Sequence, residues 1–205
     1  MKNTHELEDD LRERWLKSYP DDERKAFCFD GLCYNGEIYN DGKNAHQGNE
    51  EKLWNNTDRR ILFLMKDTNN NSDSDYREWH WRNINHNFFN CIFKWLEGLS
   101  RISKDFIPTM ENGDYAAVPN AVVTKYPLAI VNIKKISGTS FVSNKTLYEY
   151  ANRDKAFLQE QIRGILHPNI IVCGGGKGTV LNIAKNIIYE DESFRNNISA
   201  IIAGN

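Results

Sequence analysis

The run Arg60-Ile-Leu-Phe-Leu-Met65 is apolar at every position after the arginine. A strand with one solvent-exposed face alternates apolar and polar residues, whereas a strand covered by protein on both faces is apolar throughout. We therefore expect this run to be a central strand of a parallel sheet. Polar residues follow it directly, namely Lys66, Asp67 and Thr68 and then the loop 69–75, so the strand ends in a polar turn.

Further apolar runs alternate along the chain with patterns of helical spacing. The expected strands after the first are residues 128–131, 170–173 and 198–203, and the expected helices are residues 5–19, 88–99, 145–165 and 178–188. Alternation of this kind is typical of a parallel sheet with helices on both faces. We predict an α/β fold of three layers, α/β/α, around a mostly parallel central sheet of about four strands.

The 205 residues are enough for one sizeable core, and they contain no internal repeat or low-complexity linker. We expect a single globular unit in which residues 59–205 form the main α/β domain. Residues 1–58 are expected to be an N-terminal helix and a turn-rich extension packed on that domain. Within the extension, residues 27–47 are rich in Gly, Asn and Asp, which indicates turns with short strands or a hairpin.

The net charge and the hydropathy of the sequence limit the partners and the location that we expect for the protein. The formal net charge is −2, so nucleic-acid binding requires a local basic groove rather than a basic protein. No run approaches the roughly 18 apolar residues of a membrane span, and the acidic N-terminus lacks the apolar core of a signal peptide. We expect a cytoplasmic monomer with no membrane partner. Cys91 and Cys173 have apolar neighbours, and we expect them to be buried free thiols.

Polar or glycine residues follow three of the predicted strands, and ligands of open α/β sheets bind beyond such strand ends. The candidate site residues are Lys66, Asp67, Thr68, Asn69, Asn132, Lys134, Lys135, Gly174, Gly175 and Lys177. Plainer roles are also open to them. Asp67 can cap the following turn, and Asn132 can tie two loops together through its amide. Lys134 and Lys135 can be exposed charges.

Residues 60–203 resemble the uracil-DNA glycosylase superfamily. The segment ILFLMKDTNN is similar to the family's first strand and the loop after it, whose acidic residue orients the attacking water, and Asp67 takes that place. The segment LAIVNIKK is similar to a strand whose final Asn reads the flipped uracil, and Asn132 takes that place. Residues 154–175 are similar to the helix, proline, strand and glycine that follow in the family.

The sequence departs from the family at three points. Thr68 stands where the family usually has Pro, and Asn69 stands where one subgroup has an aromatic residue and another has Gly. The family's last motif is a His-containing loop that stabilises the departing uracil anion. The chain ends at Asn205, where that loop would begin. We expect either a chain cut short of the loop or a protein without that histidine.

The resemblance implies a hydrolase of DNA repair that binds DNA and cleaves the N-glycosidic bond of uracil or a related damaged base. A carboxamide offers the donor and acceptor that a base edge needs. A carboxylate stabilises the positive sugar and positions water, and lysines bind phosphates. The aromatic residues Tyr76, Trp79 and Trp81 are candidates for stacking on bases, although packing against the long helix is the plainer role for the two tryptophans.

Two other functions stay open from the residues alone. One is an inactive relative of this fold that binds nucleic acid or a nucleotide, and the other is a small-molecule hydrolase that uses the same crevice. We expect no cofactor and no metal. Some glycosylases of the superfamily hold an iron–sulfur cluster on four cysteines, and the later two lie close together just beyond the second strand. Cys28 and Cys33 could form the first pair, but no cysteine occupies the region of the later pair in this sequence. The run Gly174-Gly-Gly-Lys-Gly178 lacks P-loop spacing.

Overall fold

The structure is a computed structural model that describes residues 2–40, 44–68, 74–78, 87–107, 119–138, 141–175 and 178–191. The N-terminal elements are α1 (Thr4–Ser18), α2 (Asp21–Arg24), β1 (Cys28–Phe29) and α3 (Glu50–Asn56). The middle of the chain forms β2 (Ile61–Asp67), β3 (Ser74–Asp75), α4 (Asn87–Arg101), α5 (Pro119–Lys125) and β4 (Ala129–Lys134). The C-terminal elements are α6 (Asn144–Arg153), α7 (Lys155–Gln159), η3 (Glu160–Leu166), β5 (Ile170–Cys173), α8 (Thr179–Ile183) and η4 (Ala184–Ile188).

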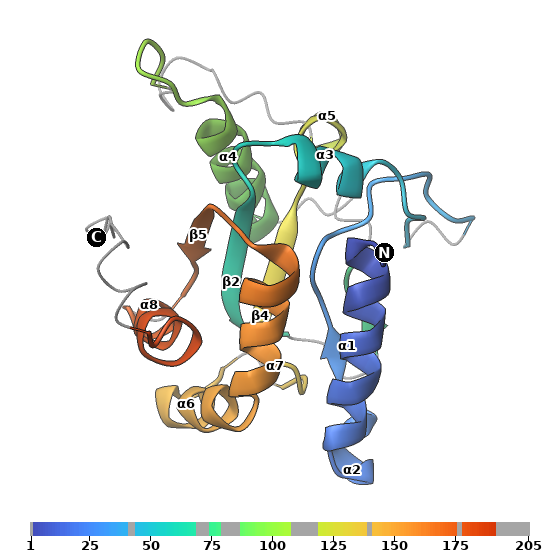
Figure 1. Cartoon of the computed structure of the whole chain (residues 1–205), viewed down its shortest axis with the longest axis vertical. Helices are drawn as coiled ribbons and strands as arrows, with labels where there is room; N and C mark the ends of the chain where they lie inside the picture. Colours follow the sequence, from blue (N-terminus) through green and yellow to red (C-terminus); the bar gives the residue numbers. More distant parts are fainter. Residues whose placement is uncertain are drawn as a thin grey trace.

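The central sheet of the described residues has three parallel strands in the order β4-β2-β5 (Figure 1). Leu64 of β2 pairs with Val131 on one side and with Cys173 on the other. The predicted α/β class and the parallel sheet are thus confirmed. The first three predicted strands are strands of this sheet, whereas the predicted strand 198–203 lies outside the described residues.

The outer edge of β4 is covered by residues 26–33 instead of a regular strand. Antiparallel bridges join Phe27 to Ile136 and Leu32 to Ala129. The same run contains β1, which pairs in parallel with β3. The turn-rich extension therefore contributes pieces of strand that shield an edge of the sheet, and such shielding protects an edge from pairing with another chain.

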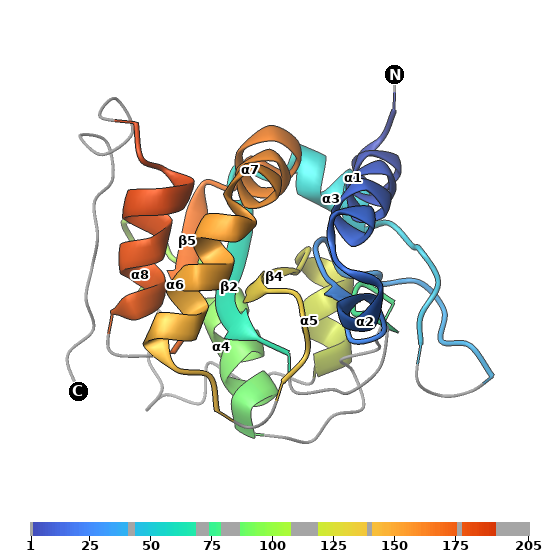
Figure 2. The same ribbon diagram turned by 90° about the horizontal axis from the view of Figure 1, so that it is seen from below.

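Helices cover both faces of the sheet (Figure 2). Successive residues of β2 belong to different cores. Leu62 and Leu64 belong to the core beneath α1, α6, α7 and α8. Ile61 and Phe63 belong to the core beneath α4 and α5. Because side chains of a strand alternate between its two faces, a strand covered on both sides must be apolar at every position, as this one is.

Helix α1 is part of the larger core. Leu11 and Trp15 are fully buried and lie in the same cluster as Leu62. The helix begins with a capping box, in which the side chain of Asn3 accepts from the Glu6 N–H and the side chain of Glu6 accepts from the Asn3 N–H. The N-terminal segment therefore packs into the core of the α/β unit.

The predicted helix 145–165 is divided at Asp154, where α6 ends and α7 begins. Asp154 is buried, and its carboxylate accepts a hydrogen bond from the hydroxyl of Tyr19. Helix α7 continues into η3, which stops at His167 in the left-handed region with φ of 45°. The division was not predicted because the apolar residues keep helical spacing across it.

Helix α4 turns Phe93 and Leu96 toward the sheet, which leaves Cys91 exposed. Cys173 is half-buried on β5. The prediction that these two thiols are buried is therefore wrong, and the buried pair is Cys28 and Cys33. No disulfide joins any two of the four cysteines. Across the described ranges, no helix combines the length and the apolar character that crossing a membrane demands.

Candidate functional site at the ends of two strands

Strands β2 and β4 end side by side, and their last residues, Asp67 and Lys134, are partners in the register of the sheet. Lys134 Nζ lies 3.6 Å from Asp67 Oδ2. Neighbouring parallel strands finish at the same edge of a sheet, which is where open α/β sheets bind ligands. The pairing of these two strands therefore brings an amine and a carboxylate together at that edge.

Lys134 is largely enclosed, with a side chain 9% exposed, so the prediction of an exposed charge is wrong for it. Its Nζ donates to the carbonyl of Ile136 and lies 5.3 Å from the centre of the Tyr150 ring. Burial lowers the pKa of Lys134, although the carboxylate of Asp67 acts in the opposite direction. Burial likewise raises the pKa of Asp67, against the lowering effect of Lys134. Both shifts favour the neutral forms of the pair, so a proton passes between them more readily than between exposed groups.

The turn after β4 packs on the turn after β2. The Gly138 N–H donates to the carbonyl of Thr68 at 3.2 Å. A Cβ at position 138 would lie 3.0 Å from Lys134 Nζ and 3.2 Å from Asp67 Oδ2. Any other residue at this position would therefore press on both members of the pair, which would have to give by a few tenths of an ångström.

Three buried oxygens around these turns have no hydrogen-bond partner among the described residues. They are Asp67 Oδ2, Thr68 Oγ1 and Ser137 Oγ. Nearly all buried polar atoms in proteins are hydrogen-bonded to protein or to water. These oxygens are thus the groups of this edge that are available to bind a water molecule or a substrate.

Asn132 is buried, and one of the two N–H donors of its carboxamide is used inside the protein. Its Nδ2 donates to Asp30 Oδ2 at 2.9 Å, and its backbone N–H donates to the same oxygen at 3.1 Å. Asn132 thus ties β4 to the edge segment 26–33, which is the plainer of the roles considered for it. The recognition of a base by Asn132 stays a prediction, and the carboxamide oxygen is the atom that we expect to contact the base.

Lys135 is fully buried and pairs with Asp30. Its Nζ also donates to Gln161 Oε1 at 3.3 Å and lies 4.9 Å from the ring of Trp15. An enclosed ammonium cannot contact a phosphate in solution, so the structure corrects both predicted roles of Lys135, phosphate ligand and exposed charge. Asp30 was missed because the sequence Phe29-Asp-Gly31 has the composition of an ordinary turn.

Lys66 and the glycines after β5 lie at the neighbouring strand end. A Cβ on Gly174 would lie 2.4 Å from the sulfur of Met65, and one on Gly175, whose φ is 92°, would lie 3.2 Å from Lys66 Cε. The glycines therefore allow β5 to end close against β2. The structure places Lys66, Gly174 and Gly175 at the sheet edge that also carries Asp67.

Other predicted residues are separate from this site or outside the described ranges. Tyr76 is buried in the core beneath α4 and α5, so its ring is packed against protein. Asn69, Trp79, Trp81 and Lys177 lie outside the described residues. Within the described ranges, no group of three or more His, Cys, Asp or Glu side chains is placed to hold a metal ion.

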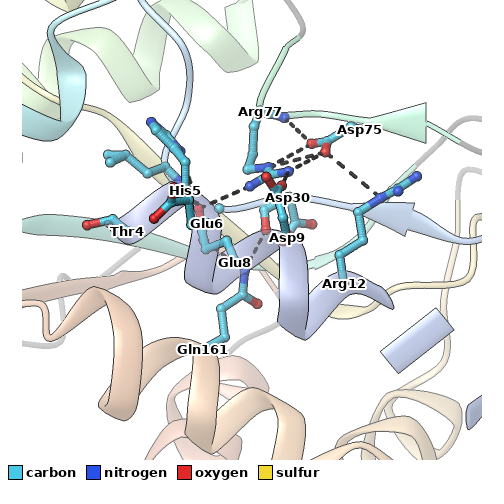
Figure 3. Close-up of polar contacts among 12 residues, drawn as sticks. Thr4, His5, Glu6, Glu8, Asp9, Arg12, Asp30, Asp75, Arg77 and Gln161 are labelled. Carbon is cyan, nitrogen blue, oxygen red and sulfur yellow. Dashed lines mark hydrogen bonds and ion pairs between the residues drawn. The ribbon is translucent and has the colours of Figure 1, made fainter. Parts of the chain in front are cut away.

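A buried polar network joins Asp30, the partner of Asn132 on β4, to α1, and Figure 3 shows its part from Asp30 to α1. Gln161 donates to the carbonyl of Asp30 at 2.5 Å and to Glu8 at 3.3 Å. Glu8, which is fully buried on α1, also accepts from the Leu32 N–H at 3.3 Å and lies 3.6 Å from Arg77 Nη1. Burial raises the pKa of Glu8, against the lowering effect of Arg77. The network thus fixes the N-terminal helix beside the segment that carries Asp30.

The outer part of this network is rich in carboxylates. Arg77 is 2% exposed and donates from Nη2 to Asp9 and to Asp75, each at 2.6 Å (Figure 3). His5 Nε2 lies 2.8 Å from a carboxylate oxygen of Glu50. Each buried charge here has an opposite or hydrogen-bonding partner, which is how proteins accommodate charge in an interior. The network has the character of a structural support for the strand ends.

Comparisons of the chain with protein-family models, with curated proteins and with solved structures find no match.

Proposed function

We propose that this chain is a DNA glycosylase-like hydrolase that cleaves the N-glycosidic bond of uracil or a related damaged base. The observation that carries the proposal is the position of Asp67 at the end of the central strand β2, with Oδ2 buried and without a hydrogen bond among the described residues. The proposal includes a central sheet of about four strands with the uracil-DNA glycosylase-like arrangement, DNA as the partner and a cytoplasmic location.

The chemistry needs a carboxylate beside the sugar. As the bond to the base breaks, positive charge develops on the sugar and a water molecule adds to its anomeric carbon. An ionised Asp67 would stabilise that charge and accept a proton from the water. The ammonium of Lys134 at 3.6 Å supports the ionised state of Asp67, because it opposes the effect of burial on the pKa of that carboxylate.

The remaining groups at the edge fit a substrate with a polar base and a phosphate backbone. The hydroxyls of Thr68 and Ser137 are buried without a partner among the described residues, so they are available as donors to base or sugar oxygens. Lys66 is half-buried at the same edge and would contact a phosphate. Asn132 would contribute its carboxamide oxygen to the base, since its Nδ2 is bonded to Asp30.

The test is release of free uracil from single-stranded and duplex oligonucleotides that contain it. We expect release by the wild-type chain and a loss of about 100-fold or more in Asp67→Asn, because removal of a catalytic acid or base typically costs this much. Asp10→Asn is the matched control, since Asp10 is half-exposed on α1 and pairs with Lys2. Asn132→Ala measures the contribution of the base-reading position.

Failure of the wild-type chain to release any base from either oligonucleotide would overturn the proposal. Retention of oligonucleotide binding at low salt in that case would identify a binding module. Equal activity of wild type and Asp67→Asn would remove Asp67 from the chemistry. Because Asn132 holds Asp30, Asn132→Ala is interpreted only together with its free energy of unfolding in urea.

A further inference from the structure

We propose that Lys134 is a nucleophile that forms an imine with the aldehyde of the ring-opened abasic sugar. This sugar is the product that the proposed hydrolysis leaves in DNA, so the identity of the aldehyde rests on the proposed function. The chemistry of the amine does not rest on it, because an abasic sugar can be supplied directly.

The geometry around Lys134 is that of an oriented amine. Its Nζ is held by the carbonyl of Ile136 and the ring of Tyr150, and Asp67 Oδ2 lies 3.6 Å away. That separation exceeds a hydrogen bond, and Oδ2 has no other partner among the described residues. The amine therefore has beside it a carboxylate oxygen that is free to take its proton.

The environment also favours the neutral amine that attack on a carbonyl requires. Burial lowers the pKa of Lys134, while the carboxylates of Asp67 and Glu23 act to raise it. Lysines become nucleophiles in proteins by desolvation of this kind. By contrast, the side chain of a surface lysine such as Lys17 is 73% exposed and lacks this desolvation.

The other buried lysine of this region is unsuited to the role. Lys135 is fully buried, and its ammonium is shared between Asp30 and Gln161. Lys66 lies at the same edge and also acts to lower the pKa of Asp67, but Lys134 is the lysine whose Nζ lies 3.6 Å from the carboxylate assigned to the hydrolytic step. The same two side chains would thus serve both reactions.

The step balances without any further reagent. The ammonium of Lys134 gives a proton to the carboxylate of Asp67, and the nitrogen lone pair then forms a bond to the aldehyde carbon. The carbonyl oxygen takes one proton from the attacking nitrogen and becomes the hydroxyl of a carbinolamine. Asp67 returns its proton to this hydroxyl, which leaves as water, and the nitrogen becomes the protonated imine. One ammonium and one aldehyde thereby give one iminium and one water.

The experiment uses a single-stranded oligonucleotide with a preformed abasic site and sodium borohydride. Hydride reduces the imine to a stable secondary amine, so the covalent adduct is counted on a denaturing gel and located by peptide mass spectrometry. We expect an adduct at Lys134, a loss of at least about tenfold in Lys134→Arg, and slower trapping in Asp67→Asn. Lys145→Arg is the matched control, since that side chain is 87% exposed on α6.

The location of the adduct on the wild-type chain shows whether Lys134 forms the imine, and this result does not depend on the stability of a variant. An adduct at another lysine, or no adduct, would overturn the proposal. Release of uracil without trapping would leave the proposed hydrolysis standing and remove the imine. Trapping at Lys134 without release of uracil would establish the imine and remove the hydrolysis. The two proposals therefore fail separately.

Discussion

Asp30 is a buried carboxylate with both oxygens engaged by β4 and the residue after it. Oδ2 accepts the two N–H groups of Asn132, and Oδ1 accepts from Lys135. Burial raises the pKa of Asp30, against the lowering effect of Lys135 and of the Asn132 donors. The backbone N–H that a regular edge strand would have satisfied is satisfied by this side chain instead, which fixes the end of β4 two residues before Lys134.

Replacing Asp30 with Ala would leave the ammonium of Lys135 buried without its counter-ion. Loss of one partner of a buried ion pair costs about 3–5 kcal/mol, so we expect the free energy of unfolding in urea to fall by about that amount. The control is Asp10→Ala, which removes the ion pair with Lys2, whose side chain is 56% exposed. Such exposed pairs contribute up to about 1 kcal/mol. Similar losses in the two variants would contradict the structural role of Asp30.

Gly138 tests the geometry of the candidate site with little effect on the core. In Gly138→Ala the new methyl would lie 3.0 Å from Lys134 Nζ and 3.2 Å from Asp67 Oδ2, which requires these groups to give by a few tenths of an ångström. Displacement of a reacting group by about 1 Å can cost about 100-fold in rate, so for this smaller displacement we expect kcat/KM for uracil release to fall by roughly 2- to 10-fold.

The matched control for that change is Gly164→Ala, where the nearest atom to the new methyl is Glu160 Cγ at 3.8 Å. This glycine lies within η3, so alanine should raise the free energy of unfolding by about 0.5–1 kcal/mol and leave release unchanged. An unchanged kcat/KM in Gly138→Ala would show that the pair at the strand ends is not the reacting centre.

At the scale of elements, the central strands could be predicted because burial on both faces leaves an unbroken apolar run, as in Ile61-Leu-Phe-Leu64. Short strands were predicted within residues 27–47, but the pairing of the segment 26–33 with β4 was not, since its bridges join residues about 100 positions apart in the sequence. Long-range pairing leaves little local signal when the strand is short and irregular.

For the candidate site, the residues could be predicted from the sequence, but their arrangement in space could not. Asp67 and Lys134 were both named as polar residues after apolar runs, but their pairing depends on the order of β4 beside β2. The burial of Lys135 depends on how the chain turns after Lys134 and on the presence of Asp30, Gln161 and Trp15 around it. The local sequence pattern predicts neither the order of the strands nor the burial of Lys135.

Helix α3 carries the carboxylate of Glu50, which should make the free energy of unfolding depend on pH in the acid range. Burial opposes the ionisation of Glu50, but hydrogen bonds from His5 and from the N–H groups of Glu50, Gly48 and Asn35 outweigh it and lower its pKa from the ordinary 4.5. A carboxyl group with a lowered pKa in the folded state stabilises the fold above its unfolded pKa. That contribution is lost as the pH falls through the folded value.

We therefore expect Glu50→Gln to lower the free energy of unfolding at pH 7 by about 1–3 kcal/mol, the usual cost of losing hydrogen bonds to a buried charged group. The difference from wild type should shrink as the pH falls below the ordinary pKa of 4.5. Urea unfolding over about pH 3–7 measures it. Glu13→Gln, at a side chain 69% exposed, is the control. A difference that is constant with pH would contradict the assignment.

At the scale of the whole molecule, two cores share one sheet, and the N-terminal extension fills part of the larger core. Leu11 of α1 lies with Leu62 in that core, whereas Phe93 of α4 lies with Phe63 on the other side. Because adjacent residues of β2 serve both cores, neither core can be lost without disturbing the strand between them. The extension and the α/β unit should therefore unfold together.

We expect a single urea transition in which far-UV circular dichroism and tryptophan fluorescence coincide, as in two-state unfolding. Leu11→Ala should lower the free energy of unfolding by about 2–5 kcal/mol and Phe93→Ala by about 3–5 kcal/mol, each shifting the whole transition. Leu7→Ala, at a residue 38% exposed on the same helix as Leu11, should cost less than about 1 kcal/mol. Buried Trp15 and Trp54 report on the larger core. If Leu11→Ala split the transition, with fluorescence lost before circular dichroism, residues 1–58 would be a separate, weaker layer on an α/β unit that stays folded without them.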